Sequence, residues 1–243
     1  MTTTNNRPPS DEAEWKIEAV LADEEEEGEG CRFYLEQYKP FRLEALQRDP
    51  DAFGSTYARE VAFADEDWLK RARNPLAQTF VVVRSRDRAI LAATTLMGPL
   101  PLHRTKPASL LISENDSNNN NNHSATHDGK LNNDTTSTTT DGADAPLSYE
   151  VSGVYTRREA RGRGFGTALM HAAAVERAAA EARLRGRRRL EVKTIVYATN
   201  AGAVAFYERC GFVTARARQN VNPLKGPEPV TELDMYFRSD VVL

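Results

Sequence analysis

The chain has 243 residues, of which 40% are hydrophobic and 28% are charged, and its formal net charge is -3 at pH 7. Two cysteines do not make a disulfide framework, and no apolar run is long enough to span a membrane. These totals exclude a disulfide-stapled scaffold and a helical membrane protein. We expect a cytoplasmic protein, with the nucleus as the alternative location.

The charge is distributed unevenly along the chain. Residues 1–30 carry ten acidic and two basic residues, and residues 113–146 carry six acidic and one basic, which leaves a net charge of +10 on the remainder. A basic body suits an anionic ligand, which is either a phosphate-bearing small molecule or a nucleic acid. The sign of the charge does not distinguish the two.

The acidic composition of residues 1–30 predicts a disordered tail. After it, apolar spacing within residues 33–47 predicts an amphipathic helix after Pro40, or a helix with a strand before it, which Asp49-Pro50-Asp51 ends. A second helical region is predicted at residues 56–73. Residues 79–84 and 89–97 are rich in aliphatic and β-branched side chains and predict a hairpin.

Residues 103–146 contain a run of five asparagines and a threonine-rich run, a composition that predicts a disordered insertion between two strands. We therefore predict one domain over residues 31–243, interrupted by this insertion. Beyond it, residues 149–155 predict a strand, residues 161–166 form a basic glycine turn, and the alanine-rich segment from Thr167 predicts a helix.

The last part of the chain continues the alternation of strands and helices. Residues 190–196 predict a strand, and Asn200 can cap a helix that ends at Cys210-Gly211. Residues 212–218 and 231–237 predict two more strands. The order of the elements indicates an α/β fold, with a mixed sheet and helices on both faces.

The glycine turn is the strongest candidate for a binding site. Backbone N–H groups at a helix start can hold a phosphate, glycines let the anion approach, and Arg161 and Arg163 add positive charge. A dinucleotide fingerprint needs a later third glycine, and a nucleotide P-loop needs Gly-Lys-Ser/Thr; this turn has neither. An RNA-binding RGG stretch is normally repeated, whereas this turn occurs once.

The segment from Arg161 to Gly166 resembles the acyl-CoA signature of the GNAT superfamily of N-acetyltransferases, whose core is Arg/Gln-x-x-Gly-x-Gly/Ala. A second segment, from Asn200 to Phe212, is similar to the family's later helix, Asn-x-x-Ala-x-x-x-Tyr-Glu-x-x-Gly-Phe. The order and spacing of the two motifs make the resemblance specific. It covers roughly residues 35–102 and 147–240.

The resemblance implies a mixed, mostly antiparallel central sheet with helices on both faces, and acetyl-CoA as co-substrate without a metal. The strand at Val154–Thr156 would offer main-chain groups to the pantetheine arm, and the amides of Arg161–Thr167 would hold the pyrophosphate. The cofactor-binding residues are then Val154, Tyr155, Thr156, Arg161, Gly162, Arg163, Gly164, Phe165, Gly166, Thr167, Asn200 and Tyr207.

Two residues are candidates for catalysis. By the resemblance, Tyr207 would protonate the leaving CoA thiolate; the alternative is an ordinary core aromatic. Glu150 is the candidate base, because an amine acceptor is mostly protonated at neutral pH; the alternative is an edge residue that faces solvent. Strand alternation predicts one face made by Glu150, Ser152 and Val154, and an opposite face made by Tyr149, Val151 and Gly153.

We therefore expect an N-acetyltransferase in which a primary amine attacks acetyl-CoA directly. A small-molecule acceptor is favoured, because Asp49–Ser55 is similar to a segment of many small-molecule members; a protein acceptor is the alternative. Two alternative functions belong to other classes of protein: a non-catalytic acyl-CoA-binding protein, and a nucleic-acid-binding protein, which the sequence does not favour. No membrane partner is expected, and a homodimer is compatible with the sequence.

Overall fold

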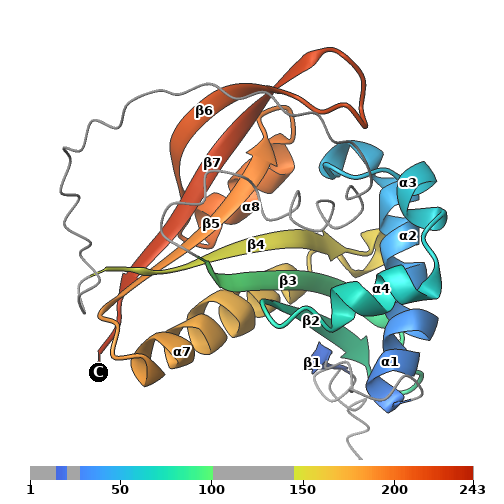
Figure 1. Ribbon diagram of the computed structural model, residues 1–243, viewed down its shortest axis with the longest axis horizontal. Coiled ribbons are helices and arrows are strands. Elements are labelled where there is room, and N and C mark those ends of the chain that lie inside the picture. Colours follow the sequence, from blue (N-terminus) through green and yellow to red (C-terminus); the bar gives the residue numbers. More distant parts are fainter. Residues whose placement is uncertain (1–14, 21–27, 101–144, 243) are drawn as a thin grey trace, which may run out of the picture.

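The computed structural model describes residues 15–20, 28–100 and 145–242, which form a seven-stranded sheet with helices on both faces (Figure 1). The spatial order of the strands is β1-β2-β3-β4-β5-β7-β6. All neighbours are antiparallel except β4 and β5, which are parallel. The strands are β1 (Trp15–Val20), β2 (Ala77–Arg84), β3 (Ile90–Leu100), β4 (Leu147–Thr156), β5 (Arg189–Tyr197), β6 (Val213–Val221) and β7 (Pro229–Asp240).

The helices form two groups and one single helix. The segments before β2 are α1 (Glu29–Phe33), the π-helical turn η2 (Tyr34–Tyr38), α2 (Lys39–Arg48), the 3₁₀ turn η3 (Pro50–Ala52), α3 (Tyr57–Val61) and α4 (Asp65–Ala72). Those between β4 and β5 are the 3₁₀ turn η5 (Arg158–Ala160), α6 (Phe165–Met170), the π-helical turn η6 (His171–Arg177) and α7 (Ala178–Leu184). The single helix α8 (Ala201–Arg209) follows β5. Among the described residues, no helix is long and apolar enough to cross a membrane.

Alternation along the strands divides the core into two layers. Val81 and Val83 of β2 pack with the helices that precede the sheet, in a cluster that contains Phe41 and Trp68. Val82, between them in the sequence, belongs to the cluster on the opposite face, which is formed with α6, α7 and α8. The sheet is therefore buried on both faces at its centre, as the α/β prediction requires.

Three predictions from the sequence need correction. Residues 15–20 lie in the expected disordered tail, but they form β1, which pairs with β2 along its whole length. The apolar alternation of Trp15 and Ile17 is the signal that the acidic composition concealed; the Trp15 ring lies 5.0 Å from the ring of Phe165. The first helical segment begins at Glu29, and the region 56–73 is two helices, α3 and α4.

Of the insertion predicted at residues 103–146, all but residues 145 and 146 lies outside the described residues. The remainder of the predicted tail, at residues 1–14 and 21–27, also lies outside them.

Strand β4 separates from β5 halfway along its length. The two strands pair only from Leu147–Glu150 to Leu190–Lys193. Beyond this point the strands diverge (Figure 1), and no other described strand takes the place of β5 beside residues 151–156. The sheet consequently has an opening at its centre, and β4 has a free edge along that opening.

A β-bulge in β4 lies at this opening. The pairing with β3 shifts between Ala93↔Tyr155 and Thr95↔Ser152, and Gly153 has a φ of 63°. The extra residue reverses the alternation, so that Val154 packs in the layer of α6 to α8 and Tyr155 in the layer of α2. Simple alternation placed Val154 with Glu150 and Ser152, and that prediction is wrong.

Candidate functional site

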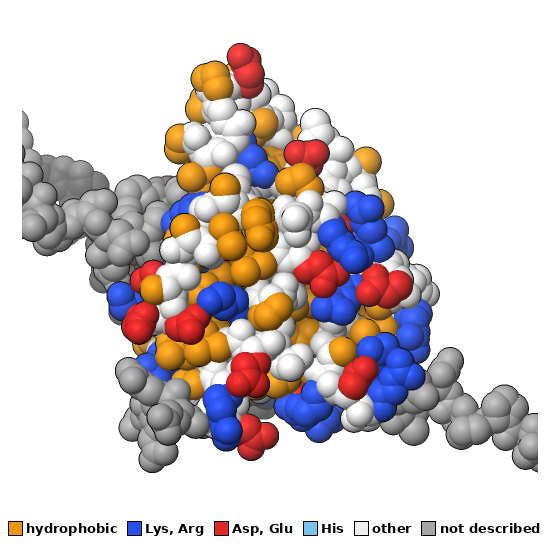
Figure 2. Space-filling view, turned by 90° about the vertical axis from the view of Figure 1, so that its right-hand side faces the viewer, with side chains coloured by type: hydrophobic (Ala, Val, Ile, Leu, Met, Phe, Trp, Pro, Cys, Tyr) orange, Lys and Arg blue, Asp and Glu red, His pale blue; other side chains and the backbone are white. Residues whose placement is uncertain are grey.

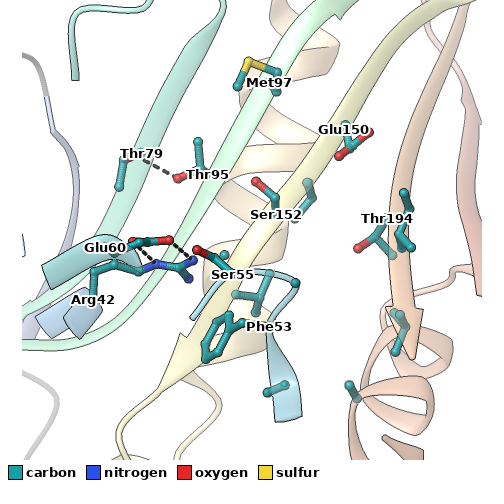
Figure 3. A pocket seen from close by; sticks show the side chains of 18 of the residues that line it. Arg42, Phe53, Ser55, Glu60, Thr79, Thr95, Met97, Glu150, Ser152 and Thr194 are labelled. Carbon is teal, nitrogen blue, oxygen red and sulfur yellow. Dashed lines mark hydrogen bonds and ion pairs between the residues drawn. The ribbon is translucent and has the colours of Figure 1, made fainter. Parts of the chain in front are cut away.

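A cavity of about 260 Å³ occupies the opening between β4 and β5. Its lining comes from both faces of the sheet: Arg42 and Glu60 from α2 and α3, and Ala203 and Tyr207 from α8. Figure 3 shows the edge of the opening, where Glu150 of β4 and Thr194 of β5 lie on its two sides. Because the cavity passes through the sheet, two molecules can meet in it from opposite faces.

The glycine turn lies beside the end of the free edge of β4. Gly162 and Gly164 have φ values of 78° and 81°, and apart from the adjoining residues no described atom lies within 4 Å of a Cβ built at either position. Gly164 precedes the first residue of α6, and a Cβ on Gly166 would lie 3.7 Å from Thr156 Oγ1. Left-handed glycines before a helix leave its first N–H groups open to an anion.

At position 166, glycine is favoured by a close packing contact and not by its backbone conformation. A Cβ at this position would lie 3.0 Å from Cε2 of Phe206 on α8. The helix after the turn and the helix that carries Tyr207 are therefore in close contact at this point. This contact fixes the glycine turn relative to the cavity.

Arg161 of the turn, and Arg158 just before it, both bind Asp49, whereas Arg163 of the turn has a different contact. Arg161 donates to the carbonyl oxygen of Thr156 (3.1 Å) and to Oδ2 of Asp49 (2.8 Å), while Arg158 donates to Oδ1 of Asp49 (2.8 Å). These hydrogen bonds hold the pKa of Asp49 below its ordinary value, and the one from Arg158 has the largest effect. The charge expected of Arg161 at the phosphate site is thus offset by Asp49, whereas Arg163 lies over the ring of Phe165 at 4.9 Å.

The other residues proposed for the cofactor lie along the same edge. The ring of Tyr155 is buried against Phe41 and Phe53, with centroids 5.6 and 5.9 Å apart, so only its main chain faces the opening. Thr167 lies in the first turn of α6. Asn200 lines the cavity, and its Oδ1 accepts from the N–H of Ala203 at 3.1 Å, which caps α8 as the sequence predicts.

Tyr207 is buried on α8 and lines the cavity. Its ring lies between those of Phe206 and Phe212, at 5.2 and 5.4 Å. Burial raises the pKa of Tyr207 to about 12, against a smaller lowering by a hydrogen bond with Thr194. The phenol therefore keeps its proton at neutral pH. Tyr207 is both a core aromatic and a cavity residue, so the two readings are not exclusive.

Glu150 is 5% exposed and lines the cavity. It is the last residue of β4 that pairs with β5, where it lies opposite Lys193, and Met97 of β3 flanks it on the other side. A solvent-facing position at a sheet edge is excluded by these neighbours. The carboxylate lies at the point where the opening begins.

Sequence reasoning missed an ion cluster in the wall opposite β4. Nε and Nη2 of Arg42 donate to Oε2 and Oε1 of Glu60 at 3.1 and 3.0 Å, and Nη1 of Arg71 donates to Oε2 at 3.2 Å. Burial alone would raise the pKa of Glu60, but Arg42 and Arg71 hold it at about 2. These residues lie 18 and 11 positions apart on ordinary helices, so no local motif marks them.

The loop between β6 and β7 is fastened to the segment after α2. Asn222 donates through Nδ2 to the carbonyl oxygen of Gly54 (2.7 Å) and to the hydroxyl of Tyr197 (3.0 Å). Nζ of Lys225 donates to the carbonyl oxygen of Pro50 at 2.5 Å. Gly54 and Tyr197 line the cavity, so this loop is attached to two residues of its lining.

No three His, Cys, Asp or Glu side chains are grouped to hold a metal ion in the described ranges. Figure 2 shows that on the face formed by α1 to α4, basic side chains lie beside acidic ones. That face is not uniformly basic, as a nucleic-acid-binding surface would be.

Residues 125–214 match the family model of the acetyltransferase (GNAT) domain, a range that holds β4, the glycine turn and α8. No curated protein matches the chain in sequence.

Solved structures share the fold. An acetyltransferase of the GNAT family from Streptococcus pneumoniae is 12% identical, with a TM-score of 0.52 over 93% of this chain and 100% of that one. A putative acetyltransferase from Salmonella typhimurium, solved with its cofactor acetyl-CoA, is 14% identical, with a TM-score of 0.51 over 94% and 96%. NAA60 from Arabidopsis thaliana, solved in complex with acetyl-CoA, is 13% identical, with a TM-score of 0.52 over 92% and 98%.

The mixed, mostly antiparallel sheet with helices on both faces is the predicted fold, and these structures confirm it. The chain therefore has the fold of these acetyltransferases, and its residues 125–214 match the GNAT acetyltransferase domain model.

Proposed function

We propose that the protein is an acetyl-CoA-dependent N-acetyltransferase that acts on a primary amine, with a small molecule as the acceptor. The observation that carries the proposal is the free edge of β4. It begins beside the cavity at Glu150 and ends next to the glycine turn, where a Cβ on Gly166 would lie 3.7 Å from Thr156 Oγ1. One extended ligand can therefore contact the turn and the cavity together.

The residues present fit acetyl-CoA. Open space around Gly162 and Gly164 suits a pyrophosphate on the first amides of α6, and Val154–Thr156 can pair with the pantetheine arm as a strand would. The family match covers this turn, and the Salmonella typhimurium and Arabidopsis thaliana proteins of the same fold were solved with acetyl-CoA. When bound, acetyl-CoA supplies the acetyl group as a thioester.

Glu150 and Tyr207 would carry the proton transfers. Glu150, at the mouth of the opening, takes the proton of the acceptor ammonium, directly or through one water, so that the neutral nitrogen attacks the thioester carbonyl. As the new C–N bond forms and the C–S bond breaks, Tyr207 would give its phenolic proton to the leaving sulfur. The second proton of the attacking nitrogen would pass to the phenolate, directly or through water, which yields the neutral amide and restores Tyr207, while Glu150 returns its proton to solvent. The pKa of about 12 leaves Tyr207 protonated and ready to donate at neutral pH.

A small acceptor is favoured by the loop between β6 and β7. At Asn222 and Lys225 this loop is hydrogen-bonded to the segment at Pro50 and Gly54, and Gly54 lines the cavity. A folded protein substrate would have to displace this loop. The mixed charges on the face in Figure 2 give no support to a nucleic-acid ligand.

Calorimetric titration of acetyl-CoA tests the proposal. Gly164→Glu places an acidic side chain in the open space before α6, and Gly186→Glu is the matched control: Gly186 has a φ of 63°, nothing lies within 4 Å of its Cβ position, and it precedes β5 outside the site. We expect saturable binding by the wild type and the control and loss of binding in Gly164→Glu. A folded wild-type protein that does not bind acetyl-CoA overturns the proposal. Binding without acetylation of any amine would instead identify a non-catalytic acyl-CoA-binding protein.

A further inference from the structure

The wall of the cavity opposite β4 carries an excess of positive charge. Three guanidinium groups line it, those of Arg42, Arg59 and Arg71, with one carboxylate, that of Glu60, which leaves a charge of +2. Arg59 lies over the ring of Phe63 at 5.4 Å, and within the described ranges it forms no ion pair. The excess is partly enclosed, because the side chains of Arg42 and Arg71 are only 15% and 14% exposed.

Arg42 is oriented toward the opening. Its Nε and Nη2 hold the two carboxylate oxygens of Glu60, and its guanidinium lies over the ring of Phe53 at 4.6 Å. The remaining nitrogen, Nη1, lies 4.0 Å from the Cβ position of Gly153, at the bulge of β4. One edge of the guanidinium is therefore bound within the protein, and its other edge faces the opening.

The far side of the cavity is acidic. Glu150 lies on β4, and Glu232 lies on β7, where Arg218 and Asn220 hold it at 3.1 and 3.0 Å. The charge of Glu232 is thus offset by Arg218. Glu150 is the base in the proposed function. The cavity consequently has a cationic wall near Gly153 and a carboxylate near Glu150. A ligand that matches both carries an anion at one end and an amine at the other.

Strand spacing sets the size of this ligand. Gly153 lies three positions after Glu150 on β4, a span of at most about 10 Å, which the bulge at Gly153 shortens. A charge-assisted hydrogen bond of roughly 3 Å at each end leaves at most about 4 Å between the ligand's amine nitrogen and its anionic group. An α- or β-amino acid has this separation, whereas a polyamine would bring a second ammonium against the three arginines.

We propose that the acceptor is a carboxylate-bearing amine of amino-acid type. Arg42 binds the carboxylate, and Glu150 binds the ammonium group. Arg59 and Arg71 add positive charge that attracts the carboxylate. This inference rests on the proposed function and names its substrate class. A planar carboxylate matches the free edge of a guanidinium, and enclosed charge–charge contacts of this kind discriminate strongly against an uncharged analogue.

The test measures kcat/KM for matched pairs of amines, with release of CoA thiol as the readout. Each L-amino acid is compared with the amine that it yields on decarboxylation, for example phenylalanine with phenethylamine and histidine with histamine, and spermidine is included. We expect at least one amino acid to exceed its decarboxylated partner by about 100-fold. We expect Arg42→Met to reduce that ratio by about 10-fold or more.

Two further variants keep the result interpretable. Arg59→Met removes a positive charge that forms no ion pair with a described carboxylate, so this variant should fold even if Arg42→Met does not. It should lower the ratio by at least about 3-fold. Arg86→Met makes the same change at a site that is 69% exposed between β2 and β3, and it should leave the ratio unchanged.

The outcomes separate this inference from the proposed function. Protein that binds acetyl-CoA and acetylates spermidine or carboxylate-free amines as well as it does amino acids overturns the substrate class and leaves the acetyltransferase assignment in place. The same holds if no carboxylate-bearing amine is acetylated at all. Failure to bind acetyl-CoA overturns the acetyltransferase assignment itself.

Discussion

The phenol of Tyr207 on α8 is hydrogen-bonded with Thr194 of β5, the first residue of β5 beyond the four that pair with β4. This contact places the tyrosine at the point where the two strands begin to diverge. The hydroxyl is thus held beside the opening in the sheet, on the face opposite to Arg42 and Glu60. A proton donor and a basic wall therefore lie on the two sides of one cavity.

Tyr207→Phe should lower kcat by about 100-fold, because the leaving sulfur loses its proton donor. The dissociation constant of acetyl-CoA should change little, since the ring and its contacts with Phe206 and Phe212 remain. Tyr149→Phe is the control: Tyr149 is also buried with a pKa of about 12, but it lies in the opposite layer from the acceptor wall and outside the cavity. An unchanged kcat in Tyr207→Phe would remove the tyrosine from the mechanism.

The pH dependence of stability should show a step in acid that belongs to Glu60. Its pKa is about 2 in the folded protein and 4.5 in the unfolded chain, so the stabilising contribution is fully present above pH 4.5 and is lost as the pH falls toward 2. The loss is on the order of 3 kcal/mol. Glu60→Gln should be less stable at pH 7 and should lack this step, which urea unfolding measured between pH 2 and pH 7 can establish. A step of equal size in Glu60→Gln would assign it to other carboxylates.

Gly166→Ala should destabilise the protein, although alanine is the better helix former. A Cβ there lies 3.0 Å from the ring of Phe206, so the ring must shift within its contacts, at a cost of about 1–2 kcal/mol, and acetyl-CoA should bind more weakly. Gly202→Ala on α8 is the matched control, because its Cβ would make an ordinary contact of 3.8 Å; it should stabilise by about 0.5–1 kcal/mol. Adding Phe206→Leu to Gly166→Ala should restore part of the affinity. Equal effects of the two alanines on thermal unfolding would show that the close approach carries no cost.

Asn222→Ala should raise KM for the acceptor several-fold and leave the affinity for acetyl-CoA unchanged. The side chain joins the β6–β7 loop to Gly54 and Tyr197 at the acceptor end of the cavity, and it does not touch the glycine turn. Asn220→Ala, two residues away on β6, loses a hydrogen bond to Glu232 and serves to separate a loop effect from an electrostatic one. A parallel loss of acetyl-CoA affinity in Asn222→Ala would contradict the division of the cavity into two ends.

Local chemistry made some elements predictable. The helix start at Asn200 is set by a side chain three residues from the N–H that it caps. The strand around Val81 is a continuous apolar run, and the strand around Val192 alternates with period two. Strand β1 was missed because charge counted over thirty residues outweighed six residues with the right alternation. The bulge at Gly153 was missed because an isolated glycine in a strand does not by itself show that the register with the neighbouring strand shifts there.

The sequence by itself indicated the resemblance to the GNAT superfamily, the glycine turn, the capped helix with Tyr207 and the candidacy of Glu150, because each depends on residues within a dozen positions of one another. Only the tertiary structure decided where β4 leaves β5, which layer Val154 enters, and that Arg42, Glu60 and Arg71 meet in one wall. Contacts of this kind join residues that lie far apart in the chain. Their geometry depends on the packing of whole helices on a twisted sheet, which no local pattern of residue types encodes.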